Sequence, residues 1–444
     1  MTADRARVRI FGAVARPLQA FLRLEAASGI LLLGCAVVAL VWANVHPESY
    51  RGTFDYPLSF GAGASITHFT LRHLINDGLM AIFFFVVGME IKRELVIGEL
   101  NSIGKATLPA VAALGGMVLP AGIFLAFNWG GPGRAGWGIP MATDIAFCIG
   151  ILTLLKDRVP HALIVFVTAL AIFDDIGGIL VIAFFYGHGL SIPWLAGACV
   201  LTLVLLVMNR SYIINGLAYG LVGAGLWYAL HHGGIHPTIA GVLLGLMIPA
   251  RPQRASREVL RELAEHVSEL DRKPPDEELE GAEILAIEEK LEDLQAPVQR
   301  FVHLLHPMVA FLIMPLFALA NSGVSLRGAG LSTLAAPVAL GMAAGLFIGK
   351  QVGILGLTLL AVKLRLAPMP GGASMMKLYG VSVIAGIGFT VALFIAALAY
   401  PDAPQLLDQA KVGILLGSFV AGGGGFVLLR LTRMGARNVG IQTI

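Results

Sequence analysis

Long apolar runs, separated by short stretches that carry charge, proline or glycine, dominate the chain. About twelve of them approach the roughly 20 residues that a membrane-spanning helix needs. Their limits are residues 24–45, 74–97, 105–128, 137–155, 160–186, 190–208, 212–230, 235–250, 299–321, 334–361, 374–399 and 410–430. This pattern predicts an all-α polytopic membrane protein with about twelve transmembrane helices.

One long polar stretch interrupts the apolar pattern between the eighth and ninth runs. We therefore divide the chain into a cytoplasmic N-terminal tail (1–23), spans 1–8 (24–250), a charged cytoplasmic insertion (251–298), spans 9–12 (299–430) and a cytoplasmic C-terminal tail (431–444). The insertion is typical of one or two amphipathic helices broken at Lys273-Pro274-Pro275. A solvated insertion and a regulatory or partner-docking segment both remain open.

The basic residues predict the orientation of the spans. An even number of spans places both termini on one side, and most of the 31 lysines and arginines fall in segments on the side of the N-terminus. By the positive-inside rule that side is cytoplasmic. The first apolar run, from Ala26 to Val45, is too long for a signal-peptide core, so we expect it to remain as span 1.

Composition supports the membrane assignment and removes other classes. The chain is 57% hydrophobic and only 13% charged, with a mean hydropathy of +0.81, whereas about a quarter of the residues in a soluble domain are charged. The net charge of +3 is small, and no basic run is interleaved with aromatic residues, so a nucleic-acid partner is not expected. Cys35, Cys148 and Cys199 have no metal-ligand or disulfide spacing, and we interpret them as packing residues.

Four ionisable residues fall deep inside the predicted spans. The segment "ALAIFDDIGGILVIAFFYG" (169–187) holds Asp174 and Asp175, span 4 holds Asp144, and span 10 holds Lys350. At about 1.5 Å per residue, all four lie roughly 20 to 25 Å from an end of their spans, near the middle of the membrane. Buried charges of this kind indicate a functional site by default.

Lys350 is the only cation at this depth, so a pair with Asp174 or with Asp175 is expected. Adjacent helical residues point about 100° apart, so one carboxylate can pair with the lysine while the other faces an ion. A purely structural ion pair is the alternative, but one lysine cannot neutralise Asp174, Asp175 and Asp144 together. Asp77, a further intramembrane acid, precedes a glycine near a helix end and is equally consistent with a helix cap.

Two of the predicted spans look interrupted. Span 4 has Pro140 followed by Thr143-Asp144, and span 11 has Gly380, Gly386 and Gly388. Such interruptions in two corresponding halves are the best sequence indication of a transporter site. An acid and a base near the broken ends, here Asp144 and Lys350, can offset the half-helix dipoles.

Several segments around these residues resemble the NhaA family of bacterial sodium/proton antiporters. They are "NDGLMAIFFFVVGMEIKREL" (76–95), "IPMATDIAFCIGIL" (139–152), "ALAIFDDIGGILVIAFFY" (169–186), "GIHPTIAGVLLG" (234–245), "HPMVAFLIMPLFALANSGV" (306–324), "GLFIGKQVGI" (345–354) and "GIGFTVALFIA" (386–396). The resemblance implies twelve spans, inverted-topology repeats, and two broken helices, spans 4 and 11, that cross. It also implies a multi-pass protein of the bacterial inner membrane, with no cofactor and no enzymatic activity.

The resemblance also assigns roles to residues. Asp174 and Asp175 match the ion-site carboxylates, Thr143 and Asp144 the break in span 4, and Lys350 the lysine that pairs with Asp174. Glu90, Arg93 and Glu94 match a cluster implicated in the pH response, and His236 matches a histidine linked to it. The stretch 53–66 lies where the family forms a β-hairpin used in homodimerisation. Two departures concern the pH set-point: the insertion is long, and Val302 stands where a relative has an acid.

The resulting hypothesis is an electrogenic antiporter that exports Na+ or Li+ in exchange for protons. Poor solvation disfavours a charged carboxylate, so a proton and a hard cation can compete for the same oxygens. The resemblance implies two protons per sodium, and either Asp174 or Lys350 can carry the second. Three other classes are less consistent with the sequence: an intramembrane aspartyl protease, whose Gly-x-Gly-Asp signature is absent, a transporter of another substrate, and a passive channel.

Overall fold

The computed structural model describes most of the chain. The described residues are 27–62, 65–187, 189–254, 256–270, 281–324 and 331–432. The predicted N-terminal tail, the Lys273-Pro274-Pro275 break and nearly all of the C-terminal tail lie outside them. The chain divides into two compact units, one of residues 1–76, 102–186 and 310–444 and the other of residues 77–101 and 187–309.

The expectation of an all-α polytopic membrane protein is confirmed. Within the described residues, eight helices are long and apolar enough to cross a membrane: Ala27–Val45, Leu71–Val96, Ile103–Asn128, His161–Phe185, Ile192–Arg210, Pro297–Asn321, Pro337–Lys363 and Pro404–Leu431. Two helix pairs pass the same test together but are bent at a short break. One pair is η2 (Pro132–Met141, a 3₁₀ helix) with α7 (Ile145–Leu154), bent by 41°, and the other is α19 (Met375–Ile384) with α20 (Phe389–Ala399), bent by 43°.

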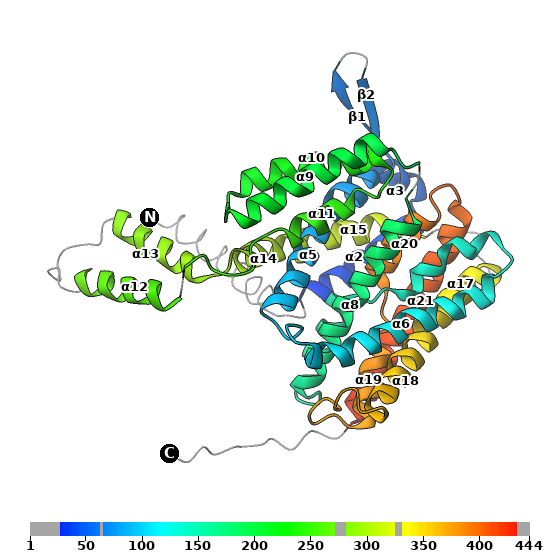
Figure 1. Cartoon of the computed structure of the whole chain (residues 1–444). Coiled ribbons are helices and arrows are strands. Elements are labelled where there is room, and N and C mark those ends of the chain that lie inside the picture. Colours follow the sequence, from blue (N-terminus) through cyan, green and yellow to red (C-terminus); the bar gives the residue numbers. More distant parts are fainter. Residues whose placement is uncertain are drawn as a thin grey trace, which may run out of the picture. The chain divides into compact units, whose positions relative to one another are not determined.

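The first unit holds most of the apolar helices. Figure 1 labels many of them and colours them along the sequence. Its elements are α2 (Ala27–Val45), α3 (Pro47–Phe54), β1 (Pro57–Ala62), β2 (Ser65–Thr70), α4 (Leu71–His73), α6 (Ile103–Asn128), η2, α7, α8 (His161–Phe185), α15 (Met314–Asn321), α16 (Leu331–Leu334), α17 (Pro337–Ala344), η4 (Gly345–Gly349), α18 (Lys350–Lys363), α19, α20 and α21 (Pro404–Leu431). Helix α20 is buried along most of its length. Such all-round burial places the break before it inside the unit.

Helices α6 and α18 pack backbone to backbone. Gly345, Gly349 and Gly353 recur every four residues, and a Cβ added at Gly353 would lie 2.1 Å from the carbonyl oxygen of Gly115. A Cβ at Gly349 would lie 2.7 Å from the Cα of Pro120. Small residues let membrane helices approach this closely, and here they fix the height of α18 against α6.

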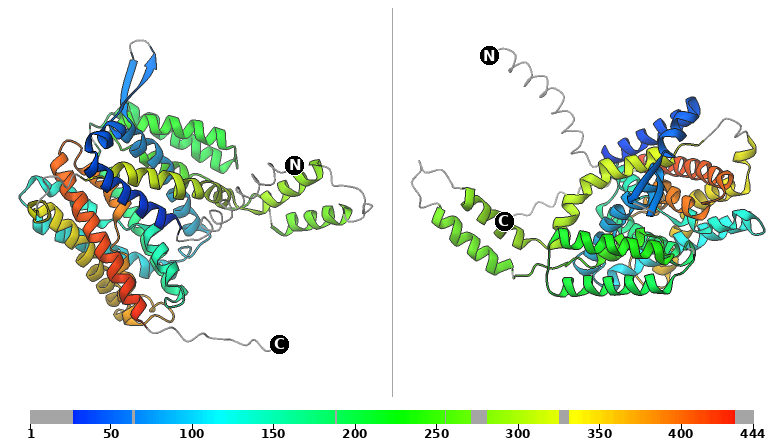
Figure 2. Two further views of the ribbon diagram at one scale, coloured as in Figure 1. Left: turned by 180° about the vertical axis from the view of Figure 1, so that it is seen from behind. Right: turned by 90° about the horizontal axis from the view of Figure 1, so that it is seen from above.

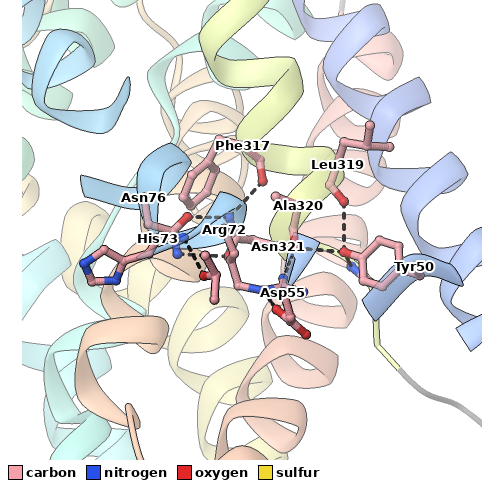
Figure 3. Close-up of polar contacts among 11 residues, drawn as sticks. Tyr50, Asp55, Arg72, His73, Asn76, Phe317, Leu319, Ala320 and Asn321 are labelled. Atoms are coloured by element: carbon pink, nitrogen blue, oxygen red, sulfur yellow. Dashed lines mark hydrogen bonds and ion pairs between the residues drawn. The ribbon is translucent and has the colours of Figure 1, made fainter. Parts of the chain in front are cut away.

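The hairpin of β1 and β2 stands at the end of the first unit, with Pro57 opposite Thr70 in an antiparallel register. Beside its base, side chains cap the carbonyl end of α15 (Figure 3). Asn321 Nδ2 donates to Asn76 Oδ1 at 2.8 Å, Arg72 donates to the carbonyl oxygen of Ala320, and the Tyr50 hydroxyl contacts that same oxygen at 2.8 Å. The cap satisfies carbonyls that a helix end leaves without partners, and burial raises the pKa of Tyr50.

The second unit contains the remaining α-helices. They are α5 (Met80–Val96), α9 (Ile192–Arg210), α10 (Gly216–Gly233), α11 (Thr238–Leu246), α12 (Ser256–Leu270), α13 (Gly281–Leu294) and α14 (Pro297–Met308). Helix α11 is shorter than the predicted run 235–250 because the Gly-Ile-His-Pro segment before it is not helical and the helix already ends at Leu246. It packs tightly on α5, since a Cβ at Gly241 would lie 2.1 Å from the carbonyl oxygen of Ala81.

The predicted insertion forms two helices, α12 and α13, which pack against each other (Figures 1 and 2). Arg254 ties the pair together, because its guanidinium bonds Glu262 and lies 3.9 Å from Asp293 of α13. This ion pair lowers the pKa of the exposed Glu262 below its ordinary value of 4.5. The described residues of the insertion thus form helices, as the sequence predicted.

Candidate ion-binding site

Helix α8 carries the two adjacent carboxylates into the core of the first unit. Asp174 is 1% exposed and Asp175 is 8% exposed. Their side chains leave the helix about 100° apart, so they meet different neighbours. A buried carboxylate is costly unless a cation or hydrogen-bond donors compensate it, so the partners of these residues define the site.

Lys350, which is fully buried, is the partner of Asp174. Its Nζ lies 2.5 Å from Asp174 Oδ2 and 2.8 Å from Thr143 Oγ1. Of the two pairings that the sequence left open, the structure contains Asp174–Lys350. The direct contact is consistent with the similar position of the two residues along their predicted spans.

Thr143 connects this ion pair to both bent helix pairs. Its hydroxyl lies 2.7 Å from Asp174 Oδ2 and 3.0 Å from the carbonyl oxygen of Ala385, at the end of α19. A hydroxyl has one proton to donate, so Thr143 donates to one of these oxygens at a time. The contact among Lys350, Thr143 and Asp174 therefore depends on the position of the α19 end.

Asp144 does not pair with Lys350. Its carboxylate caps the N-termini of two helices. Its Oδ1 accepts a hydrogen bond from Phe147 N of α7 at 3.2 Å. Its Oδ2 accepts from Thr390 N of α20 at 3.0 Å and from the Thr390 hydroxyl. A carboxylate there offsets the positive ends of both helices, as expected for Asp144. Thr390 was not singled out from the sequence, although it lies in the Gly-Ile-Gly-Phe-Thr segment.

A π-helical segment and a glycine stripe position Lys350. The π-helix η4 immediately precedes the lysine, and an extra residue in one turn changes the direction of the side chains that follow. The glycines of this turn pack so closely on Pro120 and Pro140 that an added Cβ would collide with them. Sequence reasoning missed this support, although the four-residue glycine spacing in "GLFIGKQVG" is visible.

The four residues suggested for the pH response do not form one cluster in the second unit. Near one end of α5, the Arg93 guanidinium pairs with Glu94 Oε1 at 2.9 Å, one turn from Glu90. Near the other end, roughly 20 Å away along the helix, His236 Nε2 lies 3.7 Å from Asp77 Oδ1. Asp77 lies in the π-helical segment η1 (Leu74–Leu79), so the cap interpretation of Asp77 is replaced by a contact with His236.

A cavity of about 500 Å³ adjoins Arg93 in the second unit. It is lined by Arg93, Gln299, Val302, His303, His306 and Pro307. Val302, for which the resemblance implied the loss of an acid, therefore lines the same cavity as Arg93. The cavity lining that the structure describes is thus basic and neutral at this place.

The first-unit site offers oxygen atoms of a kind that suits a hard monovalent cation. Asp174 Oδ1 is buried and has no hydrogen-bond partner among the described residues. Among all the residues that the structure describes, no group of three or more His, Cys, Asp or Glu residues is arranged to hold a metal ion. The chemistry available at the site is binding of protons or a hard cation by carboxylates.

Comparison with known proteins decides the family. A sequence profile described as Na+/H+ antiporter 1 matches residues 19–429. The chain belongs to the NhaA family of Na+/H+ antiporters. It is 64% identical over 426 residues to the Na(+)/H(+) antiporter NhaA of Anaeromyxobacter sp. (strain Fw109-5), covering 96% of this chain and 93% of the relative.

Other NhaA relatives match over similar lengths. Identity is 57% over 422 residues to Na(+)/H(+) antiporter NhaA 1 of Myxococcus xanthus (strain DK1622), covering 95% of this chain and 94% of the relative. It is 42% over 429 residues to the NhaA protein of Sulfurimonas denitrificans, covering 95% and 97%. Membership in this family makes the chain an integral membrane transporter and not an enzyme, as the sequence indicated.

Proposed function

We propose that this chain exchanges Na+ for H+ across the bacterial inner membrane at Asp174 and Asp175. The observation that carries this proposal is the buried contact of Lys350 with Asp174, with Thr143 bonded to both. A lysine held on one oxygen of a buried carboxylate occupies a position that a small cation can take over. Family membership supports Na+ and H+ as the transported ions.

The chemistry follows from competition for carboxylate oxygens. When Asp174 and Asp175 are deprotonated, Na+ or Li+ binds between them, with Asp174 Oδ1 as one available acceptor. Binding of the cation weakens the hold of Asp174 on Lys350. Protonation of the carboxylates on the opposite face releases the cation, so transport in one direction carries Na+ and transport in the other carries protons.

We further propose that each turnover exchanges two protons for one sodium ion and is therefore electrogenic. Two ionisable partners beyond Asp175 are available for the second proton, namely Asp174 and Lys350. Glu90, Arg93, Glu94 and His236 set the pH at which the cycle becomes active. In this proposal the Arg93–Glu94 pair and the His236–Asp77 contact act independently, because they lie near opposite ends of α5.

The proposed architecture has twelve spans. Each bent pair, η2 with α7 and α19 with α20, is one broken span, and α10 and α11 complete the set. The broken spans cross and belong to inverted-topology repeats. Both termini and the insertion are cytoplasmic, and the β1–β2 hairpin joins two copies into a homodimer embedded in membrane lipid. The bend angles and the helix ends held by Asp144 support this arrangement.

The test is proton movement in liposomes that contain the purified protein. The vesicles are prepared with an acidic interior, Na+, Li+ or K+ is added outside, and internal pH is followed by fluorescence for the wild type and for Asp175→Asn. We expect alkalinisation with Na+ or Li+ but not with K+, and its loss in the variant. Absence of any cation-dependent proton movement in the wild type overturns the proposal.

A further inference from the structure

The start of α20 is held by two side chains, and only one of them is charged. Helix α20 follows the break at Gly386-Ile387-Gly388, so its first backbone N–H groups need partners outside the helix. Asp144 accepts from Thr390 N. Ser418, a residue of α21 that is 7% exposed, accepts from Gly388 N at 3.3 Å and from Phe389 N at 3.2 Å through its Oγ.

The break around these contacts is tightly packed, so a shift of α20 reaches the ion site. A Cβ at Gly388 would lie 2.7 Å from the Leu346 side chain and 3.0 Å from the carbonyl oxygen of Ala142. Just before Gly388, the carbonyl oxygen of Ile387 accepts from Asp144 N at 2.6 Å. The two breaks are therefore joined at Asp144, and Ser418 ties the second break to α21.

The two capping side chains, Ser418 and Asp144, differ in charge. A hydroxyl satisfies the two N–H groups without adding charge, so among these two caps Asp144 alone supplies the negative charge at the α20 N-terminus. Without the Ser418 contacts, the freed N–H groups would compete with Thr390 for the Asp144 carboxylate. The break would then shift, and Thr143, the neighbour of Asp144, would shift relative to Asp174 and Lys350.

We propose that Ser418 is a positioning residue for sodium transport, which fixes the start of α20 and thereby sets the affinity of the carboxylate site for Na+. It acts through Gly388, Phe389 and Asp144 and does not itself contact the ion. This inference rests on the proposed antiport function. It adds α21, a helix without a predicted site residue, to the elements that define the site.

The experiment compares Ser418→Ala, Ser418→Thr and Ser382→Ala in the same liposome assay, with Na+ titrated at several pH values. Ser382 is the matched control, because it is 1% exposed and donates its hydroxyl to Leu378 O of its own helix, α19. We expect Ser418→Ala to raise the apparent KM for Na+ about three- to tenfold, a change whose free energy lies within the range that loss of a helix cap costs, with a smaller change in maximal rate. Ser418→Thr keeps the hydroxyl and restores the KM, and Ser382→Ala leaves it unchanged.

Any other result contradicts either the positioning role of Ser418 or the antiport function. An unchanged KM in Ser418→Ala overturns the positioning role, and so does a KM change that Ser382→Ala reproduces. A fall in thermal stability of Ser418→Ala with the wild-type KM reduces Ser418 to a structural residue and also overturns it. Absence of Na+-dependent proton movement in the wild type contradicts the antiport function itself, so the two failures are distinguishable.

Discussion

At the residue scale, three side chains from different parts of the chain form one hydrogen-bonded cluster. Lys350, Asp174 and Thr143 come from α18, α8 and the break after η2, and each touches the other two. The sequence predicted that a lysine and a carboxylate meet at this depth, because depth follows from counting residues along each span. Counting residues could not choose between Asp174 and Asp175, since the direction of a side chain depends on how the helix is rotated in the fold, and only the family resemblance implied Asp174.

The bridging hydroxyl gives a prediction for Thr143. Thr143→Ala removes a hydrogen bond to a charged group, worth about 1.5 to 3 kcal/mol, so we expect the apparent KM for Na+ to change by about tenfold or more. Thr143→Ser keeps the hydroxyl and should stay close to the wild type. Sodium titrations of transport in liposomes measure both, and equal behaviour of the Ala and Ser variants would contradict a role for the hydroxyl.

The buried ion pair gives a prediction for stability. Lys350→Met leaves Asp174 buried without its cation, which costs about 3 to 5 kcal/mol when one partner of such a pair is removed. Lys350→Met combined with Asp174→Asn should recover most of that loss, because no charge is left unpaired. Unfolding of the detergent-solubilised variants tests this, and a double variant no more stable than the single Lys350→Met would argue against the pair.

At the element scale, the interruptions of helices were partly predictable. Pro140 and the Gly386–Gly388 segment mark the two breaks, because both residue types disfavour a continuous helix. Gly380, also noted as an interruption, instead lies inside α19 and packs against Leu429. The π-helical turn before Lys350 was not predicted, because it depends on the contact of α18 with α6 and not on local propensity.

The glycine stripe of α18 gives a prediction with a matched control. Replacing a helical glycine by alanine favours the helix by about 1 kcal/mol when the site is open. Gly356→Ala meets nothing within 4 Å, so it should be neutral or stabilising. Gly353→Ala places a Cβ against Gly115 O and should lower both the unfolding temperature and the transport rate. Equal behaviour of the two variants in both measurements would contradict the close packing of α18 on α6.

At the scale of the whole molecule, composition and the length of the apolar runs were enough to predict a polytopic helical protein. The number of spans is harder to read, since α11 has nine residues where the apolar run has sixteen. The insertion was recognised as amphipathic from its polar and apolar spacing. Its ion pairs were not predicted, because Arg254 reaches residues of two helices that the sequence does not align.

The Arg254–Glu262 contact predicts how the insertion responds to pH. The contact lowers the pKa of Glu262, so its stabilising effect is fully present above 4.5 and is lost as the pH falls through the lowered value. We expect hydrogen exchange of the α12 amides in the intact protein to show no loosening through this contact near neutral pH. Loosening should begin below pH 4.5 and should be weaker in Glu262→Gln. Loosening of α12 near neutral pH that Glu262→Gln abolishes would contradict this assignment.

The central claim is that sodium and protons compete for the carboxylates of α8. The most direct test is the release of protons when Na+ is added to the purified protein in a weakly buffered solution, at a pH where the site is still protonated. The account predicts about two protons released per Na+ bound by the wild type, and no Na+-induced release from Asp175→Asn. Saturable Na+ binding without proton release at any pH would contradict the claim.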